Sequence, residues 1–256
     1  MRSFKWLGLL LWVSPPGFAF DMERDTWLLP ESKPLAPEAR KRFEPIEFAR
    51  VSATGNYREP VYAEGKQAEL IAAAARNDIQ QLEALLKAGV NPNAVADQWD
   101  ENALMHAVLH GNVEMTRMLL EAGAHPDTKS RGFTPLGRAS LLGHTQIVRR
   151  LLKAGADIDK KSDDGNTPLI AATIMHRLAV IRELLPYHPD TTLWNREGRV
   201  SLGIAAQEGN KDIVALLLQA DVDPNLMDRN GNRPLQWSGD HHDIAAMLVA
   251  RGGVSF

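Results

Sequence analysis

From about residue 66 onward, apolar and polar residues follow one repeated pattern, which is clearest over residues 130–162. Thr-Pro-Leu at 134–136 predicts the start of a helix, because a threonine hydroxyl can accept from the free amides of the first turn and proline has no amide to leave unpaired. Gly143 ends that helix, and apolar residues at helical spacing over 147–152 predict a second one. Gly155 suits the left-handed residue that ends a helix. The pattern therefore predicts a helix-turn-helix unit.

The unit recurs at a fixed period. Positions equivalent to Thr134 are occupied by Asn102, Thr167, Val200 and Arg233, and the last three steps (134 to 167 to 200 to 233) are 33 residues each. A period of this size indicates stacked repeats, since one helix pair cannot bury its apolar face alone. The glycine that ends the second helix recurs as Gly89, Gly123, Gly155 and Gly252, with His188 and Asp221 in its place in the two units between.

Six units fit between about residues 66 and 253, and the two terminal units are atypical. The first lacks Thr-Pro-Leu. In the last, Leu235 to Ile244 spans 9 positions where Leu136 to Ile147 spans 11, which predicts a first helix about half a turn shorter. Terminal repeats often depart from the pattern because their outer faces meet water.

These residues resemble the ankyrin repeat, whose hallmarks are Thr-Pro-Leu-His-x-Ala, Gly-His and Leu-Leu-x-x-Gly-Ala. The matching segments are GNTPLIAA at 165–172, GFTPL at 132–136 and LLKAGAD at 151–157. The resemblance implies an all-α ankyrin-repeat solenoid of about six helix-turn-helix repeats with β-hairpin-like loops, over residues 66–256. One departure runs through every unit and predicts less stable loops: the histidine after Thr-Pro-Leu is replaced by Met105, Gly137, Ile170, Gly203 and Gln236.

The first 19 residues have the pattern of a secretory signal peptide. Basic residues Arg2 and Lys5 precede an apolar run over 6–13, and small residues follow, with a cut expected after Ala19. The run is shorter than the ~20 residues of a membrane-spanning helix. A disordered apolar N-terminus is the alternative. We expect an exported protein without membrane insertion after cleavage, located in the periplasm if the source is a Gram-negative bacterium.

Residues 20–65 differ in composition from the repeats. Five prolines exclude a long helix, yet scattered aromatic residues make an inert linker a poor description. We expect an extended Pro-rich arm, either packed on the repeats or ordered by a partner. The prolines are Pro30, Pro34, Pro37, Pro45 and Pro60.

Composition narrows the function classes. The chain has no cysteine, which excludes disulfides, thiolate metal sites, cysteine nucleophiles and a lipoprotein anchor. Its formal net charge is -3, and this mild acidity argues against a nucleic-acid-binding surface. With capped repeat ends, we expect a monomer.

In proteins with this repeat, partners usually meet the hairpin tips and the first-helix face, which together form a concave surface. Mapping those positions gives an apolar centre in units two to four and a charged end in units five and six. Such an apolar cluster, if exposed, marks an interaction site, although the arm could cover it and Leu141 and Ile174 could instead fill gaps between repeats. The residues expected to bind a partner are Trp99, Glu101, Leu109, His110, Arg131, Phe133, Leu141, Leu142, Asp164, Asn166, Met175, Arg196, Arg199 and Gln207.

The histidines offer little chemistry. His106 and His110 are four residues apart on one predicted helix, a spacing that can hold zinc, but the glutamate of His-Glu-x-x-His is absent. His241 and His242 precede Asp243 in a predicted loop, where surface imidazoles are ordinary. We therefore expect no catalytic residue, no metal and no cofactor.

The sequence thus predicts a non-enzymatic, periplasmic protein that binds a protein partner of unknown identity through its concave surface. Two more specific roles remain open within this class: an immunity or inhibitor protein against a toxic enzyme, and an accessory factor for a periplasmic enzyme. A metal-dependent hydrolase that uses the histidines is the alternative from a different class.

Overall fold

The computed structural model describes residues 19–21, 26–28, 65–95 and 101–255. The chain divides into two units, residues 1–57 and 58–256, which are described separately. In the first unit, strand β1 (Ala19–Asp21) pairs antiparallel with strand β2 (Thr26–Leu28). The remainder of the predicted signal peptide and arm lies outside the described residues.

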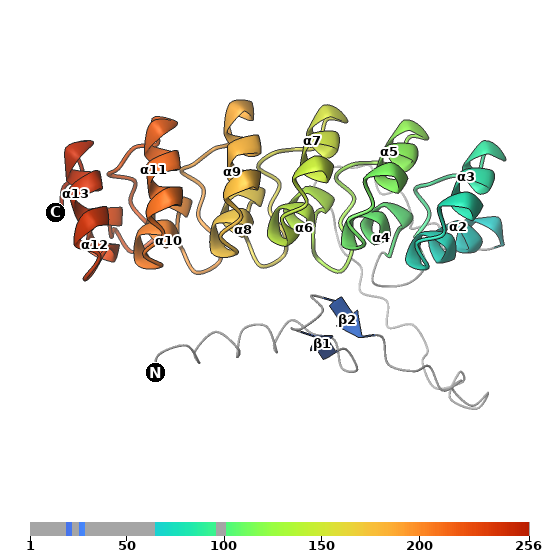
Figure 1. Cartoon of the computed structure of the whole chain (residues 1–256), viewed down its shortest axis with the longest axis horizontal. Helices are drawn as coiled ribbons and strands as arrows, with labels where there is room; N and C mark the ends of the chain where they lie inside the picture. Colours follow the sequence, from blue (N-terminus) through green and yellow to red (C-terminus); the bar gives the residue numbers. More distant parts are fainter. Residues whose placement is uncertain (1–18, 22–25, 29–64, 96–100, 256) are drawn as a thin grey trace, which may run out of the picture. The chain divides into compact units, whose positions relative to one another are not determined.

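The second unit is a stack of helix pairs, as the 33-residue period predicts. Figure 1 shows the second helices of the pairs side by side in one row and the first helices in a row beneath them. The prediction of six helix-turn-helix units is confirmed. The pairs are α2 (Lys66–Ala75) with α3 (Ile79–Lys87), α4 (Ala103–Leu109) with α5 (Val113–Glu121), α6 (Pro135–Leu142) with α7 (Thr145–Lys153), α8 (Pro168–Ile174) with α9 (Leu178–Leu184), α10 (Ser201–Gln207) with α11 (Lys211–Gln219), and α12 (Pro234–Trp237) with α13 (His242–Ala250). A short 3-10 helix, η2 (Leu185–Tyr187), extends α9.

Side-chain caps start three of the first helices at the predicted register position. The Thr134 hydroxyl accepts from the Gly137 amide at 3.0 Å, and the Thr167 hydroxyl accepts from the third residue of its own helix at 3.2 Å. Asn102 does the same for α4, at 2.8 Å. Val200 has no side-chain oxygen and makes no such bond. The predicted threonine cap therefore holds wherever the residue type permits it.

The second helices end in left-handed residues, also as predicted. The φ angle is 76° at Gly89, 89° at Gly123 and 85° at Gly155. His188 and Asp221, which replace glycine in two units, take the same conformation with φ of 54° and 57°. A positive φ is uncommon for residues other than glycine, but histidine and aspartate adopt it more readily than most, so both can replace glycine at this position.

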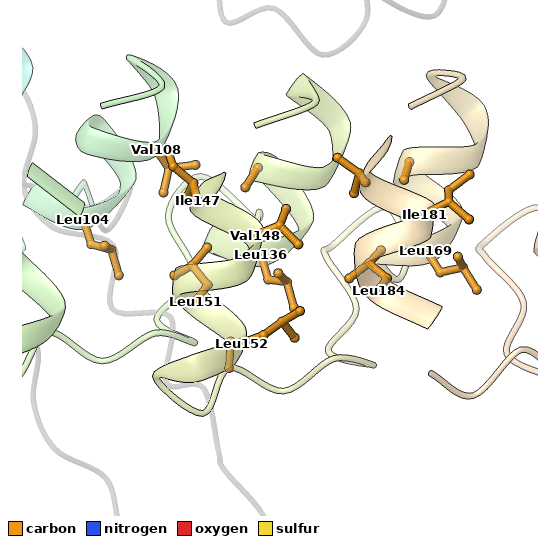
Figure 2. Close-up of a cluster of buried hydrophobic side chains, with 14 of the residues drawn as sticks. Leu104, Val108, Leu136, Ile147, Val148, Leu151, Leu152, Leu169, Ile181 and Leu184 are labelled. Carbon is orange, nitrogen blue, oxygen red and sulfur yellow. The ribbon is translucent and has the colours of Figure 1, made fainter. Parts of the chain in front are cut away.

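The core lies between the two rows of helices and runs from unit to unit (Figure 2). A single helix pair could not bury these side chains, so each unit depends on its neighbours for its core. First helices contribute Leu104, Val108, Leu136 and Leu169, and second helices contribute Ile147, Val148, Leu151, Leu152, Ile181 and Leu184, all of them buried.

Helix α12 is shorter than its counterparts, in the direction that the sequence predicts. It has 4 residues, compared with 8 in α6. Beyond Trp237 the chain turns, because the Ser238 hydroxyl donates to the Leu235 carbonyl at 2.8 Å and Gly239 has a φ of 49°. The deleted residues thus come out of the first helix and its turn, leaving α13 at full length.

Candidate functional site: the hairpin face

Hairpin loops connect consecutive units, and they form one edge of the stack. Ser162 N donates to Asn166 O at 3.0 Å, and equivalent bonds close the hairpins at 195–199 and 228–232. Neighbouring hairpins are also joined directly, since Arg229 N donates to Gly198 O at 2.8 Å. We call the surface made by residues 128–133, 161–166, 194–199 and 227–232, with the exposed ends of the first helices, the hairpin face.

Acidic side chains hold two of these hairpins from inside. Asp164 accepts from the Ser162 hydroxyl at 2.5 Å and from the Asn166 amide at 3.0 Å. Asp228 accepts from Asn232 and, at 3.1 Å, from the indole N–H of Trp237. Burial disfavours the charged Asp228 carboxylate, but these hydrogen bonds outweigh it and lower the Asp228 pKa. These two hairpins are therefore stabilised by aspartate side chains that accept hydrogen bonds, although the family's histidine after Thr-Pro-Leu is absent.

The first helices pack against the hairpins of their own units, which makes helix and hairpin one continuous surface. The Arg138 guanidinium lies 3.7 Å from the centroid of the Phe133 ring, a cation–π contact. Burial lowers the Arg138 pKa to about 10, although the charge of Asp164 opposes this. In unit five, Arg199 Nη1 donates to Gln207 Oε1 at 3.1 Å. The ends of the first helices thus belong to the hairpin face.

Most of the charged residues predicted to bind a partner are engaged in bonds within the chain. Arg131 pairs with Glu101, whose carboxylate also lies 3.8 Å from His106 Nε2. Arg199 pairs with Glu197 and contacts Gln207, and Arg196 donates to the Asp163 carbonyl. Asp164 and Asn166 bond within their hairpin. These side chains order the surface, whereas Trp99 lies outside the described residues.

The apolar centre predicted for units two to four is less exposed than expected. Of the described members, only Leu109 counts as exposed, at 38%. The others are half-buried, and at Phe133 the Arg138 guanidinium lies over one face of the ring. Phe133, Leu142 and Met175 are thus only partly exposed, and the partial burial of Leu141 and Ile174 agrees with the alternative that these two fill gaps between repeats; their role in binding a partner stays a prediction.

The most exposed large apolar side chains of the hairpins lie in units five and six, where sequence reasoning predicted a charged end. Trp194 is 46% exposed and Met227 is 51% exposed. They occupy equivalent positions, 33 residues apart, immediately before the hairpin residues Asn195 and Asp228. In the preceding unit this position is Lys161. The repeat register could have revealed the change from lysine to large apolar residues, had this position been included in the mapping.

His110 proves to be a link between units, at the turn that follows α4. Its Nε2 lies 2.8 Å from the Ala75 carbonyl of unit one. A link at another repeat position joins units four and five, where Asn210 Nδ2 lies 2.9 Å from His176 Nδ1, as Asn112 Nδ2 lies 2.7 Å from Asn77 Oδ1 between units one and two. His106 faces Glu101, so the two histidines four residues apart have separate partners. Among the described residues, no three His, Asp or Glu side chains are grouped as a metal site would require.

Within the described part of the chain, none of the helices is both long and apolar enough to span a membrane.

Comparison with known proteins agrees with the architecture. The chain is 37% identical over 67 residues to the 2-5A-dependent ribonuclease of Mus musculus; this match covers 26% of the chain but 9% of that enzyme, so it concerns a small part of a much longer protein. The model of the family "Ankyrin repeats (3 copies)" matches residues 70–162, 128–195 and 155–228, overlapping segments that together run through most of the helix stack. With six stacked units in the structure and these matches in the sequence, the chain belongs to the ankyrin repeat family.

Proposed function

We propose that this protein is exported through the leader predicted at residues 1–19 and acts in the periplasm as a non-enzymatic binding protein, holding one protein partner on its hairpin face. Ankyrin repeats indicate a protein–protein interaction module. The tripartite leader pattern supports export. We propose a monomer as the binding unit, since both ends of the stack are atypical repeats.

The observation that carries the proposal is the exposure of large apolar side chains on a surface that hydrogen bonds make rigid. Leu109, Trp194 and Met227 are exposed there although the stack buries its own core efficiently. Aromatic and long apolar side chains of this kind are common anchors of interfaces. The hairpin bonds fix the surface before the partner arrives, which lowers the entropic cost of association.

Site-specific photo-cross-linking in the native exported fraction tests the proposal. A cross-linking residue at Gln207, on the hairpin face, should capture one protein in near-stoichiometric amount. The matched control is Gln219, which is exposed at the end of α11, in the other row of helices. Equal capture from both positions, or none from Gln207, would count against a partner on the hairpin face.

The identity of the captured protein then decides the role. A toxic enzyme whose activity falls on binding would make this chain an inhibitor or immunity protein. An enzyme whose activity or lifetime increases would make it an accessory factor. Cell fractionation of the tagged full-length chain checks the location, and recovery in the cytoplasm would contradict export.

A further inference from the structure

We infer that the part of the hairpin face around Trp194 and Met227 binds an acidic segment of a partner protein, with an apolar side chain of that segment seated against the two residues. This inference rests on the proposed binding function and specifies the chemistry of its partner.

The two apolar side chains lie on neighbouring hairpins that are tied together. The hydrogen bond from Arg229 N to Gly198 O joins the hairpin that follows Trp194 to the hairpin that follows Met227. The Arg229 side chain lies over Gly198 so closely that a Cβ added there would come within 2.4 Å of it. Trp194 and Met227 therefore flank two hairpins that are joined to each other, and methionine can adapt its shape to what binds there.

Basic side chains surround this pair. Lys161 Nζ donates to the Trp194 carbonyl at 2.7 Å, which places its ammonium group beside Trp194. Arg196 and Arg229, both exposed, follow the two apolar residues by two positions. Arg196 donates to the Asp163 carbonyl, but among the described residues none of these three side chains forms an ion pair with a carboxylate, so their charges are not neutralised.

The acidic side chains of the same hairpins are engaged. Asp163 pairs with Lys129 at 2.8 Å, and Glu197 pairs with Arg199. Asp164 and Asp228 accept hydrogen bonds inside their hairpins. The charges of these hairpins that no opposite charge pairs are therefore basic, and they complement carboxylates.

A protein segment fits these observations better than a nucleic acid does. A polyphosphate backbone gains affinity from a continuous basic surface, whereas Asp163 and Glu197 interrupt this one. Separate carboxylates on a peptide can meet Arg196 and Arg229 individually. An apolar residue between them would bury area against Trp194 and Met227, and this burial supplies most of the free energy.

Selection from a phage library of short random peptides, with the mature full-length chain immobilised, tests the inference. Selected peptides should combine aspartate or glutamate with a large apolar residue. Binding of a selected synthetic peptide should weaken about tenfold or more in Trp194→Ala and in Arg229→Glu, and it should weaken further as salt is raised. Both positions are exposed, so circular dichroism should show an unchanged fold.

Matched controls separate this surface from general charge or apolarity. Arg182→Glu makes the same charge change as Arg229→Glu, at an exposed position of α9. Val249→Ala removes an exposed apolar side chain from α13. Neither variant should alter peptide binding.

The possible failures are distinguishable. This inference would be overturned if acidic peptides still bound Trp194→Ala with unchanged affinity, or if the selected peptides contained no acidic residues. In either case, cross-linking of one protein from Gln207 would still support the proposed binding function. Preferential binding of a single-stranded oligonucleotide would overturn the protein nature of the ligand. Failure of both the selection and the cross-linking would remove the proposed function itself.

Discussion

The side-chain cap of the first helices α4, α6 and α8 depends on one oxygen, and the repeats contain a natural experiment on it. Thr134 has the hydroxyl that caps α6, while Val200, of the same shape, starts α10 without it. Replacing Thr134 by valine leaves the Gly137 amide unpaired. We expect Thr134→Val to lower the free energy of unfolding by about 1 kcal/mol.

The reverse exchange is the matched test. Val200→Thr supplies an acceptor for the Gly203 amide at almost unchanged volume, and we expect it to raise the free energy of unfolding by about 0.5–1 kcal/mol. Urea denaturation of both variants measures the two changes. A loss of stability in Val200→Thr would show that the buried hydroxyl costs more than the cap contributes.

Asp159 gives a prediction with a definite pH dependence. Burial raises the Asp159 pKa, and the charges of Asp190 and Asp157 act in the same direction, while the hydrogen bond from Asp190 N opposes them. A raised pKa in the folded state means that Asp159 contributes most below its unfolded pKa of about 3.9, and that this contribution is lost as pH rises through the folded value.

Asparagine at position 159 keeps an acceptor for Asp190 N without the charge. Asp159→Asn should therefore be more stable than the wild type at pH 7, with the difference shrinking as pH falls towards 4. Urea denaturation of both proteins at several pH values measures this. A stability difference that does not change with pH would contradict the prediction.

At the scale of elements, a second set of bonds runs along the loops that follow the second helices. Asn93 Oδ1 accepts from His125 N at 2.8 Å, and Asn225 Oδ1 accepts from Val254 N at 2.9 Å. Asp127 and Asp159 act in the same way on the backbone of the next unit. Each bond couples two neighbouring units through a short polar side chain.

Thr192 occupies the repeat position of Asn93, Asp127, Asp159 and Asn225 at the junction of units four and five. Its side chain does not accept a hydrogen bond from the backbone of the next unit. Its hydroxyl donates instead to Asp190 Oδ1, 2.6 Å away in its own loop. We expect Thr192→Asn to create the bond to Asp223 N, and its Nδ2 to reach the Asp221 carbonyl as Asn225 Nδ2 reaches Gly252 O at 2.9 Å. The free energy of unfolding should rise by about 0.5–1.5 kcal/mol.

Thermal and urea denaturation measure that change, and Asn225→Thr is the control in the opposite direction. It removes the bond between units five and six and should destabilise by a similar amount. If both variants leave stability unchanged, these side chains do not couple the units.

The sequence predicts the elements well because each is specified by residues within it. Thr134, Pro135 and Gly155 determine where helices of their unit begin and end, so period and caps could be assigned before any contact was known. The exposure of Leu141 or Met175 depends on what the adjacent unit places beside it. That information is spread over two repeats, so the pattern within one repeat does not give the degree of exposure.

The binding surface shows the same limit at the scale of the whole molecule. The hairpin face could be located from the repeat register, but the bonds that occupy Glu101, Arg131 and Arg199 depend on side-chain geometry. Trp194 and Met227 lie two positions before Arg196 and Arg229, outside the hairpin positions at which the repeat pattern predicts contact with a partner. Their exposure became apparent only when the hairpins were placed side by side.

Coupling along the stack is uneven, because the junction of units four and five lacks two bonds that recur at other described junctions. Hairpin backbone bonds join Asp163 to Gly132 and Arg229 to Gly198, but among the described residues no such bond joins Arg196 to Gly165. The loop bond at Thr192 is missing at the same junction. Because a repeat stack is stabilised by nearest-neighbour interfaces, units five and six should open as a block before the units that precede them.

Native-state hydrogen exchange measures this directly. The free energy of opening should step down between α8 and α10, by more than it changes between α4 and α6. Thr192→Asn should reduce the step by about 0.5–1.5 kcal/mol, whereas Thr192→Val, which adds no acceptor, should leave it in place. A smooth decline towards both ends of the stack would mean that fraying of the terminal units, rather than a weak junction, governs opening.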